Sequence, residues 1–174
     1  TAAHADAMFA VLSDPAIYEY ENEPPPSAVW LRDRFTKLET RLSGDGTEQW
    51  LNWVIRQPDS ALIGYVQATI DAEGRAAIAY VLSSAYWGRG LAREAVDAMV
   101  AELVEHYGVR NFIAVLKGGN FRSVRLLERL GFALASPAQH MAHQIEPGEV
   151  LMCLRLGASD SALRPVALAD RRQS

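Results

Sequence analysis

The chain has 174 residues, of which 49% are hydrophobic and 22% are charged, and its formal net charge is −4. This composition is typical of one globular domain that buries a core without disulfides or metals. The acidic balance argues against nucleic-acid binding and favours cationic partners such as amines. The longest apolar run, Ala76–Leu82, is too short to cross a membrane, so we expect no membrane partner. The single cysteine, Cys153, cannot form an internal disulfide, which favours a cytoplasmic protein.

Two amphipathic helices are predicted at the start of the chain. Apolar residues recur at helical spacing over Ala5–Leu12, and the same pattern returns over Ser27–Leu42. The loop between the two segments contains three consecutive prolines, and it carries the carboxylates of Glu21 and Glu23. We expect this loop to be rigid, with its carboxylates open to a ligand or to solvent.

The middle of the chain is predicted to form antiparallel strands. Turn-rich residues separate three segments of strand composition, which are Trp50–Arg56, Ala61–Ile70 and Arg75–Leu82. Two hairpins follow from this spacing. Trp50 and Trp53 lie on the first of these strands, and Trp30 lies on the helix before it. We interpret all three tryptophans as core residues rather than as a cage for a cationic ligand.

Two further helices and three short strands are predicted after residue 90. Leu91–Tyr107 has an apolar residue at every fourth position, and Gly108 follows it as a helix cap. The remaining elements are the strand Phe112–Leu116, the helix Phe121–Leu130 and the closing strands Phe132–Ala135 and Val150–Leu156. We therefore expect a mixed α/β domain over residues 1–157, followed over 158–174 by a linker and a mobile tail; the alternative is that Leu163–Leu168 adds an edge strand to the sheet.

The most informative stretch is Trp87-Gly88-Arg89-Gly90, which joins an apolar strand directly to a helix. The first N–H groups of a helix lack partners and carry partial positive charge, so a glycine turn at this point is suited to bind a phosphate. Arg89 and Arg93 add cationic donors. A dinucleotide-binding fingerprint would need glycine in place of Arg93, and the Gly-Lys-Ser/Thr of a P-loop is absent. A tight turn without a ligand is the plain alternative.

Two segments carry a resemblance to a known family. Tyr80–Ala92 resembles motif A of the GNAT acetyltransferases, whose Gln/Arg-x-x-Gly-x-Gly/Ala signature holds the pyrophosphate of acetyl-coenzyme A. Trp87 replaces the Gln/Arg, Gly90 matches the first glycine and Ala92 matches the last position. The segment Asn120–Phe132 resembles the Asn-x-x-Ser signature of the RimJ/RimL-like branch, and the two segments stand in the family's order and spacing.

The resemblance implies a mixed, mostly antiparallel sheet, flanked by about four helices, in which a parallel strand pair splays apart. Acetyl-coenzyme A would lie in the slot between these strands, with its pantetheine arm along Tyr80–Leu82 and its pyrophosphate on Gly88–Arg93. No metal is implied. The coenzyme-binding residues expected from the resemblance are Tyr80, Val81, Leu82, Trp87, Gly88, Arg89, Gly90, Leu91, Ala92, Arg93, Asn120 and Ser123.

The implied reaction moves an acetyl group to a primary amine of a small molecule or a peptide by direct attack in a ternary complex. We expect the N–H of Leu82 to stabilise the oxyanion. Ser123 would face the leaving thiol, or bond back within its helix. Asn120 is also a favourable N-cap, a role compatible with contact to the coenzyme.

An amine is mostly protonated at neutral pH, so the reaction needs a base. The Glu and Tyr that many relatives use are replaced by Val115 and Leu127. We expect the catalytic base from the acceptor side, with Glu21 as the leading candidate. The other candidates are Glu23, Tyr20, Asn52 and Tyr86.

Two other interpretations stay open: a non-catalytic acetyl-coenzyme A-binding sensor or scaffold of the same fold, and a module that binds another nucleotide.

His140 and His143 have no carboxylate or cysteine at metal-ligand spacing, so we expect a solvated loop there. Cys153 lacks an activating partner and is expected in the core. The oligomeric state stays open, with a homodimer as one option.

Overall fold

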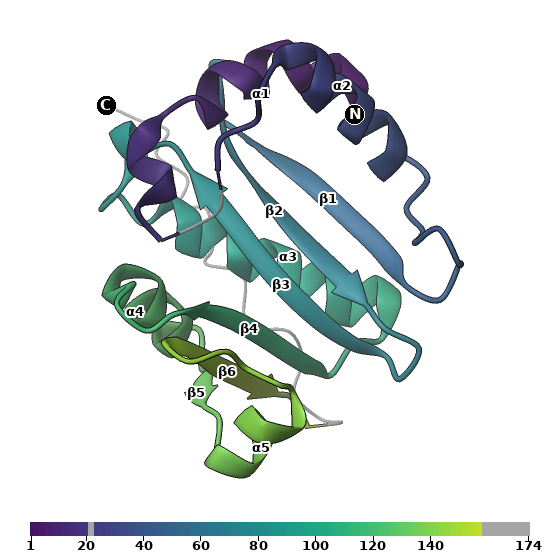
Figure 1. The fold of residues 1–174 in the computed structure, drawn as a ribbon, viewed down its shortest axis with the longest axis vertical. Helices are drawn as coiled ribbons and strands as arrows, with labels where there is room; N and C mark the ends of the chain where they lie inside the picture. Colours follow the sequence, from purple (N-terminus) through teal and green to yellow (C-terminus); the bar gives the residue numbers. More distant parts are fainter. Residues whose placement is uncertain (21–22, 158–174) are drawn as a thin grey trace, which may run out of the picture.

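The computed structural model describes residues 1–20 and 23–157. A six-stranded sheet with the order β1-β2-β3-β4-β6-β5 forms its centre (Figure 1). The strands are β1 (Gln49–Arg56), β2 (Leu62–Ile70), β3 (Arg75–Leu82), β4 (Asn111–Lys117), β5 (Ala133–Leu134) and β6 (Glu149–Arg155). Glu21, the expected tail over 158–174 and the expected edge strand Leu163–Leu168 lie outside the described residues.

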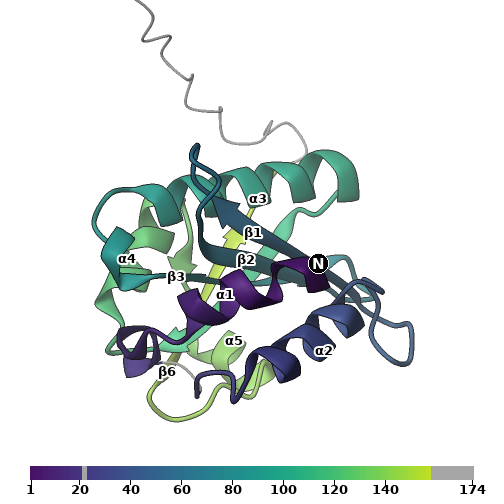
Figure 2. The ribbon, with the colours of Figure 1, turned by 90° about the horizontal axis from the view of Figure 1, so that it is seen from above.

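Helices cover both faces of the sheet, as the view from above shows (Figure 2). α1 (Ala5–Leu12) and α2 (Ala28–Leu38) lie on one face, while α3 (Leu91–Tyr107) and α4 (Phe121–Arg129) lie on the other. The described chain also contains α5 (Pro137–Ala142) and three short 3₁₀ turns, which are η1 (Ala2–His4), η2 (Pro15–Glu19) and η3 (Ser84–Tyr86). The predicted mixed α/β fold is therefore confirmed.

The first three strands form two antiparallel hairpins, as predicted. β2 and β3 approach each other closely near their ends, where Gly64 pairs with Leu82. A Cβ atom added to Gly64 would clash with the carbonyl oxygen of Val81. Gly64 was not predicted to be important, although its lack of a side chain lets the last residues of β3 lie this close to β2.

The parallel pair β3–β4 is short and splayed. Only three residue pairs join these strands, from Arg75 and Asn111 to Ala77 and Ile113. β3 then continues to Leu82 while β4 keeps its antiparallel pairing to β6 as far as Lys117. The carboxyl-terminal halves of β3 and β4 are thus not paired with each other, which confirms the expected splayed pair.

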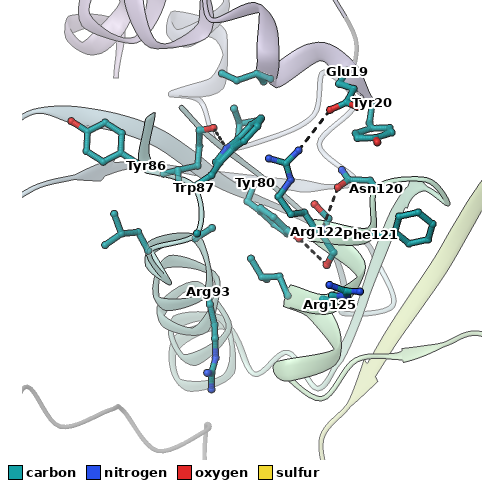
Figure 3. Close-up of a pocket in the computed structure, with 18 of the residues that line it drawn as sticks. Glu19, Tyr20, Tyr80, Tyr86, Trp87, Arg93, Asn120, Phe121, Arg122 and Arg125 are labelled. Atoms are coloured by element: carbon teal, nitrogen blue, oxygen red, sulfur yellow. Dashed lines mark hydrogen bonds and ion pairs between the residues drawn. The ribbon is translucent and has the colours of Figure 1, made fainter. Parts of the chain in front are cut away.

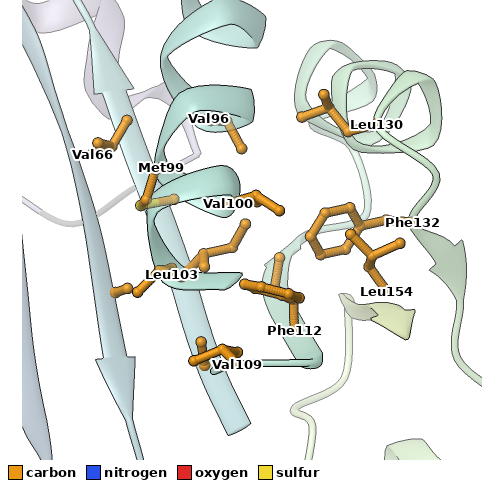
Figure 4. Close-up of a cluster of buried hydrophobic side chains, with 14 of the residues drawn as sticks. Val66, Val96, Met99, Val100, Leu103, Val109, Phe112, Leu130, Phe132 and Leu154 are labelled. Carbon is orange, nitrogen blue, oxygen red and sulfur yellow. The ribbon is translucent and has the colours of Figure 1, made fainter. Parts of the chain in front are cut away.

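The main core lies between the sheet and the pair α3–α4 (Figure 4). Buried side chains recur along α3 at intervals of three and four residues, so one face of the helix packs on the strands. Phe112 of β4 is 1% exposed, and it lies beside Phe132 and Leu154 in this cluster. A smaller cluster joins α1 and α2 to the opposite face of the sheet. The two cores hold β3 rigidly between them.

Two local predictions are wrong. Trp30 is 45% exposed rather than a core residue, because it lies in the first turn of α2 and lines an open cavity instead of packing in the buried cluster. His140 belongs to α5 rather than to a solvated loop, and its Nε2 atom accepts a hydrogen bond from the N–H of Leu151 at 3.0 Å. A capping box at Ser136, with Pro137 in the first turn, explains the start of this short helix.

Candidate functional site

A cavity of about 730 Å³ opens where β3 and β4 separate (Figure 3). Its lining residues come from η2, from the end of β3 and the turn that follows, from the first turn of α3, and from the whole length of α4 with the turn before it. Most of the expected coenzyme-binding residues line it together: Tyr80, Val81, Leu82, Trp87, Gly88, Gly90, Leu91, Ala92, Arg93, Asn120 and Ser123. The structure therefore brings the two sequence signatures to one place.

The end of β3 presents backbone groups to this cavity. The N–H of Ser83 donates to the carbonyl of Ile63 on β2 at 2.8 Å, and the bonding direction alternates along an antiparallel strand. Tyr80 and Leu82 consequently direct their N–H and C=O groups away from β2, on the side where β4 diverges. Val81 directs its backbone toward β2. An extended ligand beside β3 would therefore meet Tyr80 and Leu82.

The glycine turn leaves the start of α3 without a side-chain cap. Gly88 and Gly90 have φ angles of 74° and 83°, which L side chains rarely adopt, and Gly90 is the N-cap residue. An added Cβ would meet no atom within 4 Å at Gly88, and only Glu94 Oε1 at 3.9 Å at Gly90. Both glycines are thus required by the backbone conformation rather than by packing inside the protein. The first residues of α3 line the cavity, and the start of a helix is a suitable place for an anion.

Trp87 is fixed between the strand and α4. Its Nε1 atom donates to the carbonyl oxygen of Leu82 at 2.8 Å. The Cζ atom of Arg122 lies 3.8 Å from the centroid of its ring (Figure 3). Arg89 instead lies over the ring of Tyr86, 5.3 Å from its centroid, and it is not among the residues that line the cavity.

Asn120 caps α4 as predicted. Its Oδ1 atom accepts a hydrogen bond from the N–H of Ser123 at 3.2 Å. The carbonyl of Ser123 accepts one from the hydroxyl of Tyr80 at 3.4 Å, so the two walls of the cavity meet at this point. These contacts hold Asn120 and Ser123 at the cavity surface.

Four arginines and a single carboxylate, Glu19, line this cavity among the residues that the structure describes. The arginines are Arg93, Arg122, Arg125 and Arg129. A concentration of positive charge in a chain of net charge −4 indicates an anionic ligand. The three arginines of α4 were not among the residues predicted for the site. Their spacing of three and four residues, which places them on one helical face, was the available signal.

A second cavity, of about 820 Å³, lies between α2, η2 and the outer strands. Aromatic and polar side chains form much of its wall, namely Tyr18, Glu23, Trp30, Phe35, Asn52, Tyr65 and Gln67. Ile17 and Val81 line both cavities, so the two spaces adjoin at the end of β3. Of the candidate bases, Glu23 and Asn52 line this second cavity, whereas Tyr20 and Tyr86 line the first.

A carboxylate ties η2 to the turn after β3. Asp14 accepts hydrogen bonds from the N–H groups of Ser84 at 2.8 Å and Ala16 at 3.0 Å. The hydrogen bonds from Ser84 hold the pKa of the Asp14 carboxyl below its usual value. This contact fixes the wall that the two cavities share.

The other described residues considered for a catalytic role lie outside the two cavities. Burial raises the pKa of the Cys153 thiol, which leaves it a poor nucleophile. Leu127 is 1% exposed in the core, and Val115 lies on an exposed part of β4.

Within residues 1–20 and 23–157 we find no cluster of three or more His, Cys, Asp or Glu side chains placed to hold a metal ion. The same residues contain no helix both long and apolar enough to cross a membrane.

Similar proteins agree with this geometry. The chain is 28% identical over 129 residues to an uncharacterized N-acetyltransferase p20 of Bacillus licheniformis, covering 74% of this chain and 72% of that protein. It is 28% identical over 140 residues to an L-2,4-diaminobutyric acid acetyltransferase of Streptomyces avermitilis, covering 72% of this chain and 76% of the relative.

Solved structures share the fold at lower identity. RimL, a ribosomal L7/L12 alpha-N-protein acetyltransferase in complex with coenzyme A, superposes with a TM-score of 0.73 and 15% identity, covering 90% of this chain and 90% of that chain. Residues 1–133 match the family described as the acetyltransferase (GNAT) domain. The chain therefore belongs to the GNAT acetyltransferase family.

Proposed function

We propose that the protein is an acetyl-coenzyme A-dependent N-acetyltransferase of the RimJ/RimL-like branch, which moves an acetyl group to a primary amine. The observation that carries the proposal is the cavity between β3 and β4, where the part of β3 that diverges from β4, a helix start without a side-chain cap and four arginines converge. These three features match the three chemical parts of the coenzyme: an amide-containing arm, a pyrophosphate and further negative charge.

The phosphates would lie on the turn Gly88–Arg93. Backbone N–H groups at the start of α3 supply donors, and the positive end of the helix favours the negative charge. The open space in front of Gly88 and Gly90 fits this role, because a side chain there would occupy it. The arginines of α4 would supply further charge-assisted hydrogen bonds from the opposite wall.

The pantetheine arm would extend along β3. Tyr80 and Leu82 direct peptide groups to that side, and an arm with two amides can hydrogen-bond along this edge as another strand does, sharing the Leu82 carbonyl with the indole of Trp87. Asn120 and Ser123 lie on the facing wall. This arrangement would bring the thioester to the end of β3, where the two cavities adjoin.

The acceptor amine would enter from the second cavity. Its nitrogen attacks the thioester carbonyl carbon, so that a C–N bond forms, the C–S bond breaks and the sulfur leaves with the electron pair. The N–H of Leu82 would stabilise the oxyanion. The hydroxyl of Ser123 would hydrogen-bond the departing thiolate, which then takes a proton from solvent. Glu21 and Glu23 precede α2 in sequence, and Glu23 lines the second cavity, so a carboxylate of this loop is our proposed base.

The acceptor class is a primary amine of a small molecule or of a peptide. The two similar proteins with named substrates act on a diaminobutyric acid and on a protein N-terminus, so both kinds of amine fit the proposal. A binding protein without turnover is the second candidate, favoured by the apolar residues Val115 and Leu127 at positions where many relatives carry an acid and a tyrosine.

Thiol release from acetyl-coenzyme A, measured with a panel of amines and confirmed by the mass of the acetylated product, tests the proposal. Turnover with at least one amine supports the enzyme. Thermal stabilisation by acetyl-coenzyme A without turnover on any amine supports the sensor; a ligand at 100 times its Kd adds about 2.7 kcal/mol to the free energy of unfolding. Equal stabilisation by ATP or NAD would contradict both.

A further inference from the structure

Arg122, in the first turn of α4, lies where three parts of the cavity meet. Its guanidinium stacks over Trp87, with Cζ 3.8 Å from the ring centroid. Its Nη2 atom lies 3.6 Å from Oε2 of Glu19 at the end of η2 (Figure 3). One side chain therefore bridges the glycine turn and the N-terminal segment across the cavity.

The Glu19 side chain has Tyr20 as a second neighbour. A side-chain hydrogen bond with Glu19 raises the pKa of the Tyr20 phenol. The Tyr20 ring in turn packs against the turn that precedes α4, since a Cβ added to Gly119 would lie 3.4 Å from its Cε1 atom. Tyr20 therefore lies beside both the Glu19 carboxylate and the turn before α4.

The Arg122–Glu19 pair is accessible to a competing anion. The two side chains are 55% and 57% exposed, and ion pairs in water contribute little stability. A phosphate offers a guanidinium two parallel charge-assisted hydrogen bonds, which are stronger than one contact at 3.6 Å. Stacking on Trp87 keeps the guanidinium in the cavity whichever anion it binds.

We propose that Arg122 is a phosphate ligand for the coenzyme and that Glu19 competes with the phosphate for it. Glu19 then weakens coenzyme binding, because one ion pair has to break before the other forms. The inference rests on the proposed function, since it takes a coenzyme A phosphate as the ligand.

A double-mutant cycle with coenzyme A tests this exchange by calorimetry. Arg122→Gln should weaken binding by about 10- to 100-fold, the range for lost charge-assisted hydrogen bonds. Glu19→Gln should tighten binding by about 2- to 5-fold, the range for an exposed ion pair. The double variant should bind no more tightly than Arg122→Gln alone, because Glu19 then has no partner to compete for.

Pantetheine, which carries no phosphate, separates binding from a structural role. Its affinity, measured by competition, should be the same for the wild type and for Arg122→Gln. Arg155→Gln and Glu128→Gln, at exposed positions outside the cavity, are the matched controls and should leave coenzyme affinity unchanged.

The outcomes are distinct. Wild-type protein that does not bind coenzyme A would overturn the proposed function itself. Two results would overturn only the role of Arg122. One is that the wild type and Arg122→Gln bind coenzyme A with the same affinity. The other is that Arg122→Gln loses as much affinity for pantetheine as for coenzyme A. If Glu19→Gln tightens coenzyme binding as much in the Arg122→Gln background as in the wild type, the proposed competition is wrong.

Discussion

The two adjoining cavities differ in what defines them. The cavity between β3 and β4 is shaped largely by backbone: a strand edge, two glycines with positive φ and a helix start without a side-chain cap. The second cavity is shaped by the side chains of residues such as Trp30, Asn52 and Tyr65. A site built from backbone leaves a short, recognisable sequence signature, whereas a site built from side chains of distant segments does not. This difference explains why we can propose one particular coenzyme, acetyl-coenzyme A, but only a class of acceptor, the primary amines.

The largest effect is expected from Gly90→Val. The branched side chain would occupy the space in front of the first amides of α3, and coenzyme affinity should fall by more than about 100-fold, as expected when several backbone hydrogen bonds to a phosphate are lost. Calorimetry with coenzyme A measures the loss. Gly74→Val is the matched control, because Gly74 has a φ of 74° with no atom within 4 Å of an added Cβ, but lies in the β2–β3 turn. Equal losses of affinity in both variants would show that backbone strain, and not blocked phosphate binding, is responsible.

The side-chain cavity can be changed without changing the backbone cavity. Trp30→Ala should lower kcat/KM for the acceptor by about 10-fold, the usual range for truncating one aromatic contact, while the Kd of coenzyme A stays the same. Steady-state kinetics and calorimetry provide the two numbers. A change in coenzyme affinity with unaltered acceptor kinetics would reverse our assignment of the two cavities.

The close approach of β2 and β3 should be sensitive to one methyl group. Gly64→Ala would force the carbonyl of Val81 to move, and we expect a loss of about 1–3 kcal/mol in the free energy of unfolding, as for other overpacked sites. Denaturant titration measures this loss. Because Gly64 pairs with Leu82, turnover should fall even where the variant is fully folded. Full turnover in the folded variant would argue against a role for the Leu82 N–H.

The cap and ligand roles of Asn120 can be separated by a matched pair. Asn120→Ala and Ser27→Ala each remove an N-cap, of α4 and α2 respectively, and each should cost about 1 kcal/mol in the free energy of unfolding. Only Asn120→Ala should also weaken coenzyme binding. Identical coenzyme affinity in the two variants would leave Asn120 as a cap alone.

The smallest effect is expected from Asp14, which joins η2 to the turn after β3. Its pKa is lowered in the folded state, so its stabilisation is present above the unfolded pKa and is lost as pH falls through the folded value. Asp14→Asn should therefore lower Tm at pH 7 more than at pH 2 to 3. Thermal melts across this range give the comparison, and a pH-independent difference in Tm would contradict the role of the charge.

The fold could be predicted largely because its signals are local. The helix Leu91–Tyr107 and the strand Arg75–Leu82 have the predicted bounds, since one ends at a glycine cap and the other is followed by a turn. α2 is shorter than predicted because its apolar pattern continues past the residue where the helix ends. The expected coenzyme-binding residues were identified by their resemblance to a family motif, and their roles remain predictions.

Contacts between distant segments could not be predicted from the sequence. Nothing in the pattern around Glu19 indicates that it faces Arg122, which lies more than one hundred positions later in the chain. Trp30 was expected in the core because large aromatic residues usually are, and only the tertiary structure shows that it lines an open cavity. Side-chain placement of this kind depends on tertiary packing rather than on local pattern.

The most direct test of the account is a crystal structure of the protein with coenzyme A. We predict the pyrophosphate within hydrogen-bond distance of the main-chain amides of Gly88–Arg93, with the pantetheine arm beside Tyr80 and Leu82. A pyrophosphate bound elsewhere, with those amides in contact with the protein itself, would contradict the account.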